Sequence, residues 1–230
     1  MIATNLHAVT DRIAQACARA GRATGSVQLL AVSKTFGPDA VQQAFDAGQR
    51  AFGENYIQEA VDKITALSAL PIEWHCIGPI QSNKTRLVAE HFQWVHTVDR
   101  LKIAQRLSDQ RPAHLPPLQV CIQVNVDGGP TKSGVLPAEA AALALAVRAL
   151  PRLQLRGIMC IPEPAPDFVA ARAVFMSAKA IFDAIVEQGV PLDTLSMGMS
   201  GDLDAAIAGG STMVRVGSAI FGARHYPGVA

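Results

Sequence analysis

The chain passes from a run of apolar residues into a lysine and then a turn within Leu29-Leu30-Ala31-Val32-Ser33-Lys34-Thr35-Phe36-Gly37-Pro38. The segment from Val27 to Val32 has the length and β-branched content of a strand buried on both faces. Lys34 is therefore predicted to stand at the carboxyl end of that strand, where α/β proteins place their chemistry. Two interpretations are open. Lys34 is the first solvated residue of a loop, or it is a reactive amine able to form a Schiff base.

Strand-like and helix-like segments alternate along the rest of the chain without a break in composition. An amphipathic helix over residues 4–20 comes first, and the predicted strands span 27–32, 50–55, 73–78, 94–98, 118–126, 153–160, 194–197 and 212–216. Helices are predicted over 38–47, 56–67, 82–92, 99–109, 137–150, 167–187 and 202–208. This order favours an α/β fold, a single (β/α)8 TIM-type barrel with an additional N-terminal helix, in one domain spanning residues 1–230. An open, doubly wound sheet is the alternative.

Composition excludes several classes of function. Half of the residues are hydrophobic, 17% are charged and the net charge is +1, with no basic run to suggest nucleic-acid or membrane-surface binding. The apolar segments are shorter than the roughly 18 residues that span a bilayer, and no signal peptide is visible. The four cysteines and six histidines form no paired or metal-binding motif. We therefore expect a cytoplasmic protein with reduced thiols and without a metal site.

Two loops near the end of the chain have the composition of a phosphate site. Ser200 lies just past the seventh predicted strand and Asp202 in the first turn of a short helix, while Gly217 and Ser218 follow the eighth strand. Barrels of this type commonly bind phosphate with these two loops, and exposed amides beside small residues favour a dianion. Turn glycines and N-cap residues explain either loop alone. Both loops at the two expected positions favour a phosphate site.

Closure of the barrel would make Lys34 a neighbour of these loops, because strand eight pairs with strand one. A cofactor with an aldehyde and a phosphate on opposite sides of one ring would span the two. Pyridoxal 5′-phosphate has that structure, and a Schiff base with lysine is its usual linkage. Arg215, near the end of the eighth strand, is predicted to face the pyridine nitrogen and keep it unprotonated. That would weaken the ring as an electron sink.

Further motifs run through the chain from about residue 5 to 225. They include Ala31-Val32-Ser33-Lys34, Phe52-Gly53-Glu54-Asn55-Tyr56-Ile57-Gln58-Glu59, Trp74-His75-Cys76-Ile77-Gly78, Gln81-Ser82-Asn83-Lys84, Lys132-Ser133-Gly134, Arg156-Gly157-Ile158-Met159 and the block from Ser196 to Gly222. In this order and spacing, the chain resembles the pyridoxal-phosphate homeostasis proteins, which are relatives of the barrel domain of alanine racemase.

The resemblance implies a role for each site residue. Lys34 would be the Schiff-base lysine, Ser200 and the amides of Gly217 and Ser218 would bind the phosphate, and Arg215 would lie at the pyridine nitrogen. Asn55 and Met197 would line the pocket. One departure is visible, since the family often has an acidic residue where Gly201 stands.

Two functions from different classes follow. The first is a pyridoxal-phosphate-binding protein that takes part in intracellular vitamin B6 homeostasis without strong catalysis of its own, with apo pyridoxal-phosphate enzymes as partners. The second is a small amino-acid racemase, which needs an acid/base group on each face of the cofactor. In racemases of this fold, the opposing tyrosine comes from a second domain of the partner subunit. We expect no such domain in this chain and therefore a monomer; its tyrosines are Tyr56 and Tyr226. The binding function is favoured.

Three other polar residues have open roles. His75 is predicted to be a satisfied core histidine in preference to a proton shuttle. The resemblance indicates a place near the pocket for Lys84. Lys132 is equally well a ligand contact or a loop charge.

Overall fold

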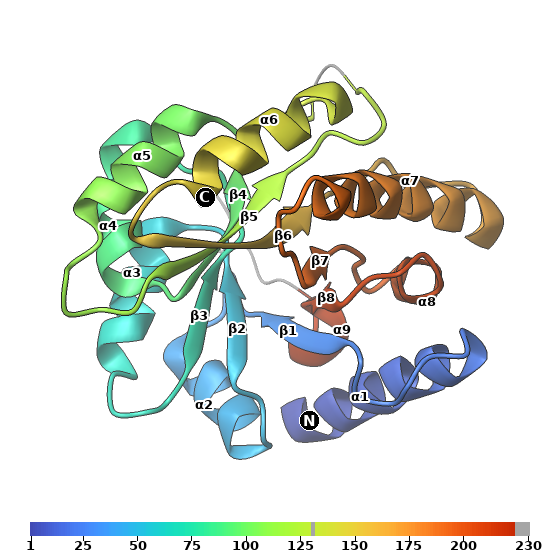
Figure 1. Ribbon diagram of the computed structural model, residues 1–230. Helices are drawn as coiled ribbons and strands as arrows, with labels where there is room; N and C mark the ends of the chain where they lie inside the picture. Colours follow the sequence, from blue (N-terminus) through green and yellow to red (C-terminus); the bar gives the residue numbers. More distant parts are fainter. Residues whose placement is uncertain (130–131, 224–230) are drawn as a thin grey trace, which may run out of the picture.

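Eight parallel strands close into a barrel in the order β1 to β8, and β8 pairs with β1 (Figure 1). The computed structural model describes residues 1–129 and 132–223. The strands are β1 (Gln28–Val32), β2 (Ala51–Glu54), β3 (Glu73–Cys76), β4 (Trp94–Val98), β5 (Leu118–Gln123), β6 (Leu153–Met159), β7 (Thr194–Ser196) and β8 (Met213–Val216). The predicted barrel is confirmed, and the open doubly wound sheet is wrong.

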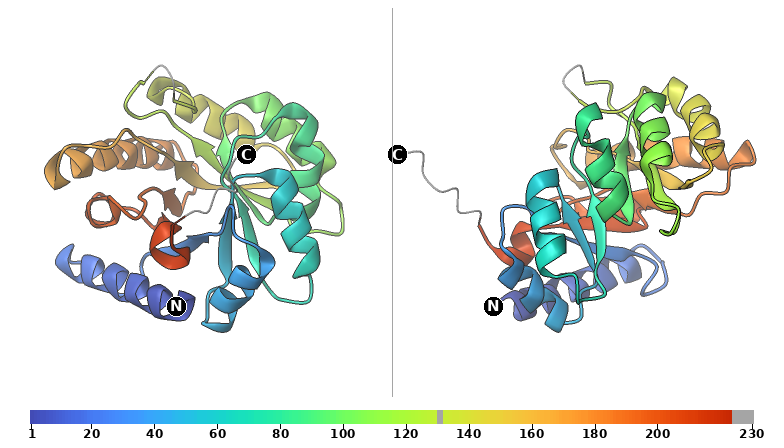
Figure 2. Two further views of the ribbon diagram at one scale, coloured as in Figure 1. Left: turned by 180° about the vertical axis from the view of Figure 1, so that it is seen from behind. Right: turned by 90° about the vertical axis from the view of Figure 1, so that its left-hand side faces the viewer.

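Helices follow the strands and surround the barrel (Figure 2). They are α1 (Ile2–Arg19), α2 (Pro38–Asp46), α3 (Ile57–Ala66), the 3-10 turn η1 (Ser82–Lys84), α4 (Thr85–His91), α5 (Leu101–Gln110), α6 (Pro137–Arg148), α7 (Phe168–Glu187), α8 (Leu203–Ala208) and α9 (Ser218–Phe221). The predicted helix over 82–92 is divided between η1 and α4. The short helix α9 was not predicted, because four residues hold too little periodicity to recognise.

Local sequence signals set where several helices begin. Pro38 and Pro137 occupy the first turns of α2 and α6, where no backbone N–H is needed. Asp167 caps α7, and its Oδ1 accepts a hydrogen bond from the amide of Ala170 at 2.8 Å. Because all the strands are parallel, the loops that lead from strands into these helices lie at one end of the barrel.

Helix α1 packs beside α8 and α9 and lies along the outside of the barrel near β1 (Figure 1). Its polar side chains bond to the loop after β7 and to the helices α8 and α9. Asn5 Nδ2 donates to the carbonyl of Ile220 at 3.0 Å, and Arg12 Nη1 donates to the carbonyl of Ser200 at 2.9 Å. Arg12 also pairs with Asp204 at 2.6 Å. The additional helix thus holds the Ser200 loop directly and contacts the short helix that follows Gly217.

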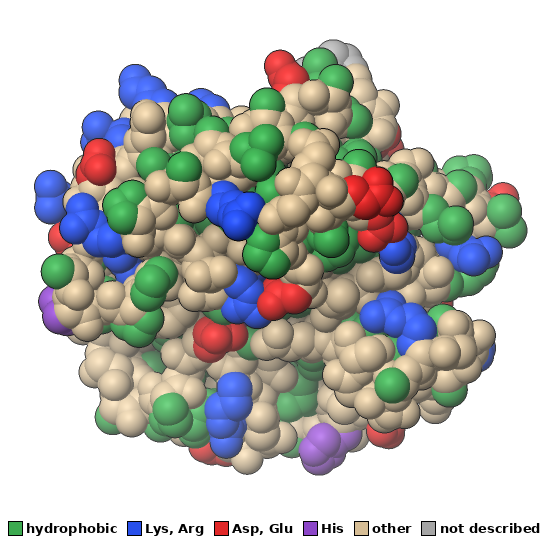
Figure 3. Space-filling view, viewed as in Figure 1, with side chains coloured by type: hydrophobic (Ala, Val, Ile, Leu, Met, Phe, Trp, Pro, Cys, Tyr) green, Lys and Arg blue, Asp and Glu red, His purple; other side chains and the backbone are tan. Residues whose placement is uncertain are grey.

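The surface carries charges of both signs, and the cysteine side chains are buried. Charged side chains of both signs are interspersed on the face shown in Figure 3. Nowhere in the described ranges is a helix long and apolar enough to cross a membrane, and these residues contain no cluster of three potential metal ligands. The cysteines are free and buried. Burial raises the pKa of the Cys76, Cys121 and Cys160 thiols to about 12, so they stay protonated.

Candidate functional site

A cavity of about 210 Å³ lies at the carboxyl ends of the strands. Six of the predicted site residues line it, namely Lys34, Asn55, Ser200, Arg215, Gly217 and Ser218. The rest of its wall is Val32, Ile77, Ile161, Met199 and Gly201. The volume is smaller than the roughly 300–1,000 Å³ of pockets for drug-sized ligands. The cavity therefore suits a small molecule, with one amine and one guanidinium in its wall.

Met197, the seventh predicted site residue, does not line the cavity. Its side chain is fully buried in the hydrophobic core, and the cavity wall does not include it. Met199, two residues further on, lines the cavity and is 43% exposed. The structure therefore places Met197 among packing residues.

Arg215 brings a buried positive charge to the cavity. It lies on β8 with 4% of its surface exposed, donates through Nη1 to Ser196 Oγ at 2.8 Å, and donates through Nη2 to the carbonyl of Cys160 at 3.0 Å. Both acceptors are neutral, and no carboxylate of the described chain pairs with it. Burial lowers the pKa of this guanidinium. A buried cation held only by neutral dipoles is suited to an electron-rich ligand atom.

The backbone beside Lys34 adopts a conformation that is rare for its residue type. Thr35 has a φ of 69°, in the left-handed region that β-branched residues seldom occupy. Its amide donates to Glu59 Oε1 at 2.8 Å, which holds the turn in place. Such conformations cluster at functional sites, where the surrounding structure enforces them. This turn carries the chain out of β1 with Lys34 on the cavity wall.

A buried polar cluster supports the same segment from behind. Ser33 Oγ donates to Glu54 Oε1 at 2.6 Å, and Lys63 Nζ donates to Glu54 Oε1 and to the Ser33 carbonyl, each at 2.8 Å. Lys63 also pairs with Glu59 at 2.6 Å. Burial raises the pKa of Glu54, and the charge of Lys63 opposes that rise. Sequence reasoning missed this cluster, although the i,i+4 spacing of Glu59 and Lys63 on a helix was a usable signal.

The segments that follow β7 and β8 supply Ser200, Gly201, Gly217 and Ser218 to the cavity wall. Gly217 connects β8 to α9, and a Cβ added there would lie 3.0 Å from the Val32 carbonyl oxygen, so the close approach to β1 favours glycine. At Gly201, a Cβ would meet nothing within 4 Å. The missing acidic residue therefore leaves the packing of the Ser200 loop undisturbed.

Asn55 presents an unused acceptor to the cavity. Its side-chain Oδ1 is buried without a hydrogen-bond partner, which is rare enough in native proteins to call for an explanation. Its backbone is packed tightly, since a Cβ on Gly78 would lie 2.1 Å from the Asn55 carbonyl oxygen. Asn55 lines the cavity, so a ligand donor that reaches this buried oxygen would satisfy it.

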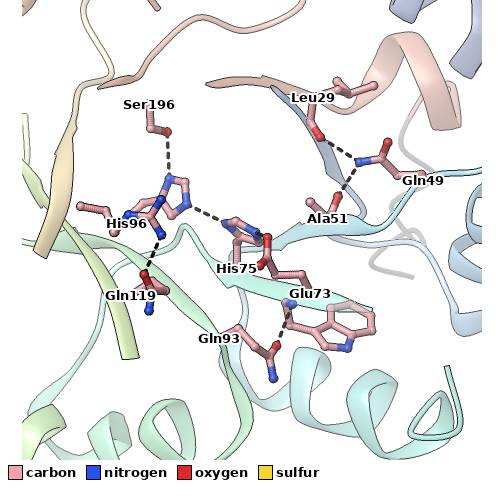
Figure 4. Close-up of polar contacts among 11 residues, drawn as sticks. Leu29, Gln49, Ala51, Glu73, His75, Gln93, His96, Gln119 and Ser196 are labelled. Atoms are coloured by element: carbon pink, nitrogen blue, oxygen red, sulfur yellow. Dashed lines mark hydrogen bonds and ion pairs between the residues drawn. The ribbon is translucent and has the colours of Figure 1, made fainter. Parts of the chain in front are cut away.

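The barrel interior holds His75 as a core residue outside the cavity wall. Its Nε2 lies 2.9 Å from Glu73 Oε1 and its Nδ1 lies 2.9 Å from His96 Nε2, as Figure 4 shows. Both ring nitrogens therefore have partners, which agrees with the predicted satisfied core histidine. His96 was not singled out from the sequence, although Trp94, His96 and Val98 alternate as barrel-facing residues would.

The remaining candidates lie away from the cavity wall. Lys84 ends η1, and Lys132 pairs with Glu163 at 3.0 Å. Tyr56 precedes α3 and is 53% exposed. Tyr226 lies outside the described residues. None of the described three lines the cavity.

Comparison with known proteins places this chain in a family. The family model described as the alanine racemase N-terminal domain matches residues 4–225. The pyridoxal phosphate homeostasis protein of Pseudomonas aeruginosa is 58% identical over 225 residues, covering 98% of this chain and 96% of the relative. The protein of that name from Escherichia coli is 55% identical over 228 residues, with 98% and 97% covered.

Solved structures agree. PipY of Synechococcus elongatus, in a structure with PLP bound, matches with a TM-score of 0.83 and 36% identity, covering 96% of this chain and all of that one. Alanine racemase from Corynebacterium glutamicum shares the fold, with a TM-score of 0.70 at 17% identity, and this chain covers 62% of it. The chain therefore belongs to the pyridoxal phosphate homeostasis protein family, built on the barrel of the alanine racemase N-terminal domain.

Proposed function

We propose that this protein binds pyridoxal 5′-phosphate in the cavity and takes part in intracellular vitamin B6 homeostasis, without strong catalysis of its own. The single observation that carries the proposal is the meeting of Lys34, Arg215 and the Ser200 and Gly217 loops around one small cavity. PipY, which has the same fold and 36% identity, holds PLP in its structure. Relatives at 55–58% identity are named for the homeostasis of this cofactor.

Each residue has a defined task in this proposal. The Lys34 amine would condense with the cofactor's aldehyde carbon, whose oxygen would leave as water, and Ser200 with the Gly217 and Ser218 amides would bind its phosphate. Arg215 would donate to the pyridine nitrogen and keep it unprotonated, because a buried guanidinium has donors only. The bound cofactor would supply an electron-withdrawing ring, and an unprotonated nitrogen would weaken that property. Holding the cofactor therefore fits the site better than strong catalysis.

The cavity wall also argues against racemisation. Two-base racemisation needs a proton-transferring group on each side of the substrate. Among the described residues that line the cavity, Lys34 and Arg215 are the titratable ones, and a guanidinium is a poor base. Tyr56 is largely exposed and lies off the wall. No specific observation favours the racemase, and negligible alanine racemisation by chiral chromatography is expected.

We extend the proposal to the domain organisation, the oligomeric state, the location and the partners of the protein. Residues 1–230 would form a single cofactor-binding domain, acting as a monomer in the cytoplasm. Apo pyridoxal-phosphate enzymes are the proposed recipients. Mixing loaded protein with such an apo enzyme, in the presence of a trap for free cofactor, would test direct transfer.

The binding proposal is tested by reduction with borohydride and mass spectrometry. Wild-type protein incubated with pyridoxal 5′-phosphate should gain one reduced adduct, which peptide mapping locates at Lys34. Lys34→Ala should lose both the adduct and the absorbance band of the bound cofactor. Lys84→Ala is the matched control, since Lys84 lies outside the cavity wall. An adduct that persists in Lys34→Ala at wild-type yield would contradict the assignment.

A further inference from the structure

A chain of polar side chains crosses the interior of the barrel and ends at Arg215. Figure 4 shows its course from Glu73 through His75 and His96 to Ser196. Glu73 Oε1 lies 2.9 Å from His75 Nε2, His75 Nδ1 lies 2.9 Å from His96 Nε2, and His96 Nδ1 lies 2.8 Å from Ser196 Oγ. Ser196 Oγ accepts from Arg215 Nη1 at 2.8 Å. Glu73 is the first residue of β3, so the chain joins the amino end of the strands to the cavity at their carboxyl ends.

Neutral imidazoles give every hydrogen bond of this chain one direction, which the carboxylate of Glu73 sets. A carboxylate only accepts, so a neutral His75 carries its proton on Nε2 and donates it to Glu73. His75 Nδ1 then accepts from the Nε2–H of His96, which leaves Nδ1 of a neutral His96 unprotonated. Ser196 O–H donates to that Nδ1, and its oxygen accepts from Arg215, because a guanidinium only donates.

Burial and packing support neutral imidazoles. His75 and His96 are fully buried, and burial lowers the pKa of both. The ring of His75 stacks on Trp94 with centroids 5.2 Å apart and an interplanar angle of 10°. Protonation of both rings would set N–H against N–H between His75 Nδ1 and His96 Nε2, and protonation of His96 would turn its Nδ1 into a donor that takes a lone pair of Ser196 Oγ. The neutral state of the two rings therefore leaves the Ser196 lone pairs to Arg215.

We propose that Glu73, His75, His96 and Ser196 are positioning residues that present an acceptor to Arg215 and so hold its guanidinium at the cavity. Their effect on a ligand rests on the proposed binding of pyridoxal 5′-phosphate, while the order of protons within the chain exists without it. Arg215 does not obtain this orientation from a carboxylate, because its hydrogen-bond partners within the described residues are Ser196 and the Cys160 carbonyl. Substitutions at these positions inside the barrel would thus alter the contact between Arg215 and the ring of a bound cofactor.

The proton order is tested on cofactor-free protein by nitrogen-15 NMR of the histidine side chains at pH 7.5. Both His75 and His96 should appear as neutral rings protonated on Nε2, assigned through His75→Gln and His96→Gln. A charged ring, or a ring protonated on Nδ1, would overturn the proposal. This result does not depend on whether the protein binds a cofactor.

The effect on the cavity is tested with Ser196→Ala, using pyridoxal 5′-phosphate as the probe. Loss of a hydrogen bond to a charged group should weaken binding by about tenfold or more, and it should shift the absorbance maximum and the pH titration of the bound cofactor. Ser196→Thr, which keeps the hydroxyl, should restore the spectrum. Ser211→Ala is the matched control, because Ser211 is also fully buried but donates to backbone carbonyls.

The outcomes separate this inference from the proposed function. A Ser196→Ala spectrum and affinity equal to those of Ser211→Ala would overturn the positioning role while leaving cofactor binding intact. Wild-type protein that fails to bind the cofactor would instead contradict the proposed function, and the NMR result would still decide the proton order.

Discussion

The two histidines inside the barrel should destabilise the protein as the pH falls from 7.5 to 5.5. Burial is the main cause that lowers the pKa of His75, against the opposing effect of Glu73. Burial, with the neighbouring His75 and Arg215, places the pKa of His96 well below its usual value. Both rings are therefore expected to remain neutral in the folded state, while in the unfolded chain they take up protons near a pKa of about 6.5.

The sign and size of this change in the free energy of unfolding follow from proton linkage. The unfolded state binds more protons below pH ~6.5, so the contribution to stability is fully present above that pH and is lost as the pH falls. Between pH 7.5 and 5.5, each ring that stays neutral removes about 1.4 kcal/mol from the free energy of unfolding. The pair should therefore remove about 2.7 kcal/mol.

The assay is urea unfolding of cofactor-free protein at pH 7.5, 6.5 and 5.5, followed by tryptophan fluorescence. The double variant His75→Gln/His96→Gln should lack this part of the pH dependence. His7→Gln is the control, because His7 is exposed. Burial raises the pKa of Glu54, so the contribution of this carboxyl to the free energy of unfolding changes with pH in the opposite direction. It falls as the pH rises above the ordinary pKa of the group. That contribution is shared by all variants and cancels in the difference.

A small difference would refute the reasoning. If wild type and the double variant differ in their pH dependence by no more than about 1.4 kcal/mol, at least one ring is charged in the folded protein. The single direction of hydrogen bonds from Arg215 to Glu73 would then be lost. The histidines would have to be treated as packing groups with an ordinary titration.

Two further predictions concern the frame of the site. Lys63→Met should lower the free energy of unfolding by about 3–5 kcal/mol, because it leaves the buried carboxyl of Glu54 without its cation; the double variant Lys63→Met/Glu54→Gln should recover part of this loss in urea unfolding, and no recovery would contradict the pairing. Gly157→Ala should cost about 1–3 kcal/mol or more, since the new Cβ would lie 1.6 Å from the Thr194 carbonyl oxygen. Gly201→Ala, which points into open space, should stay within about 0.5 kcal/mol of wild type, and equal losses in the two glycine variants would refute the steric argument.

Much of the fold was readable from the sequence because its signals are local. The spacing of apolar residues separated strands from helices, and most boundaries differ from the structure by one or two residues. β5 is an exception, since it ends at Gln123 and the predicted strand continued to Val126. There the chain leaves the sheet, and Val124 forms an isolated bridge with Val135. The hydrophobic pattern continues through that bridge, so the pattern alone could not show where the strand ends.

The candidate site was readable where a single residue or loop carries the chemistry. Lys34 at a strand end, and small residues after the last two strands, are chemical types at recognisable positions. Their meeting in one cavity follows from the closure of β8 against β1. Met197 was assigned to the same cavity, but a single added residue along a strand reverses the side that a side chain faces. Its burial in the core was therefore decided by register.

The sequence by itself determined the alternation of strands and helices, the lysine at the end of the first strand and the loops that suit a phosphate. Only the tertiary structure decided which polar side chains face the barrel interior and which of them touch. His96 and Ser196 are 100 residues apart in the chain, and Arg215 reaches the Cys160 carbonyl across 55 residues. Hydrogen bonds require contact to within about 3 Å, and that contact depends on the register of neighbouring strands, which local patterns do not encode.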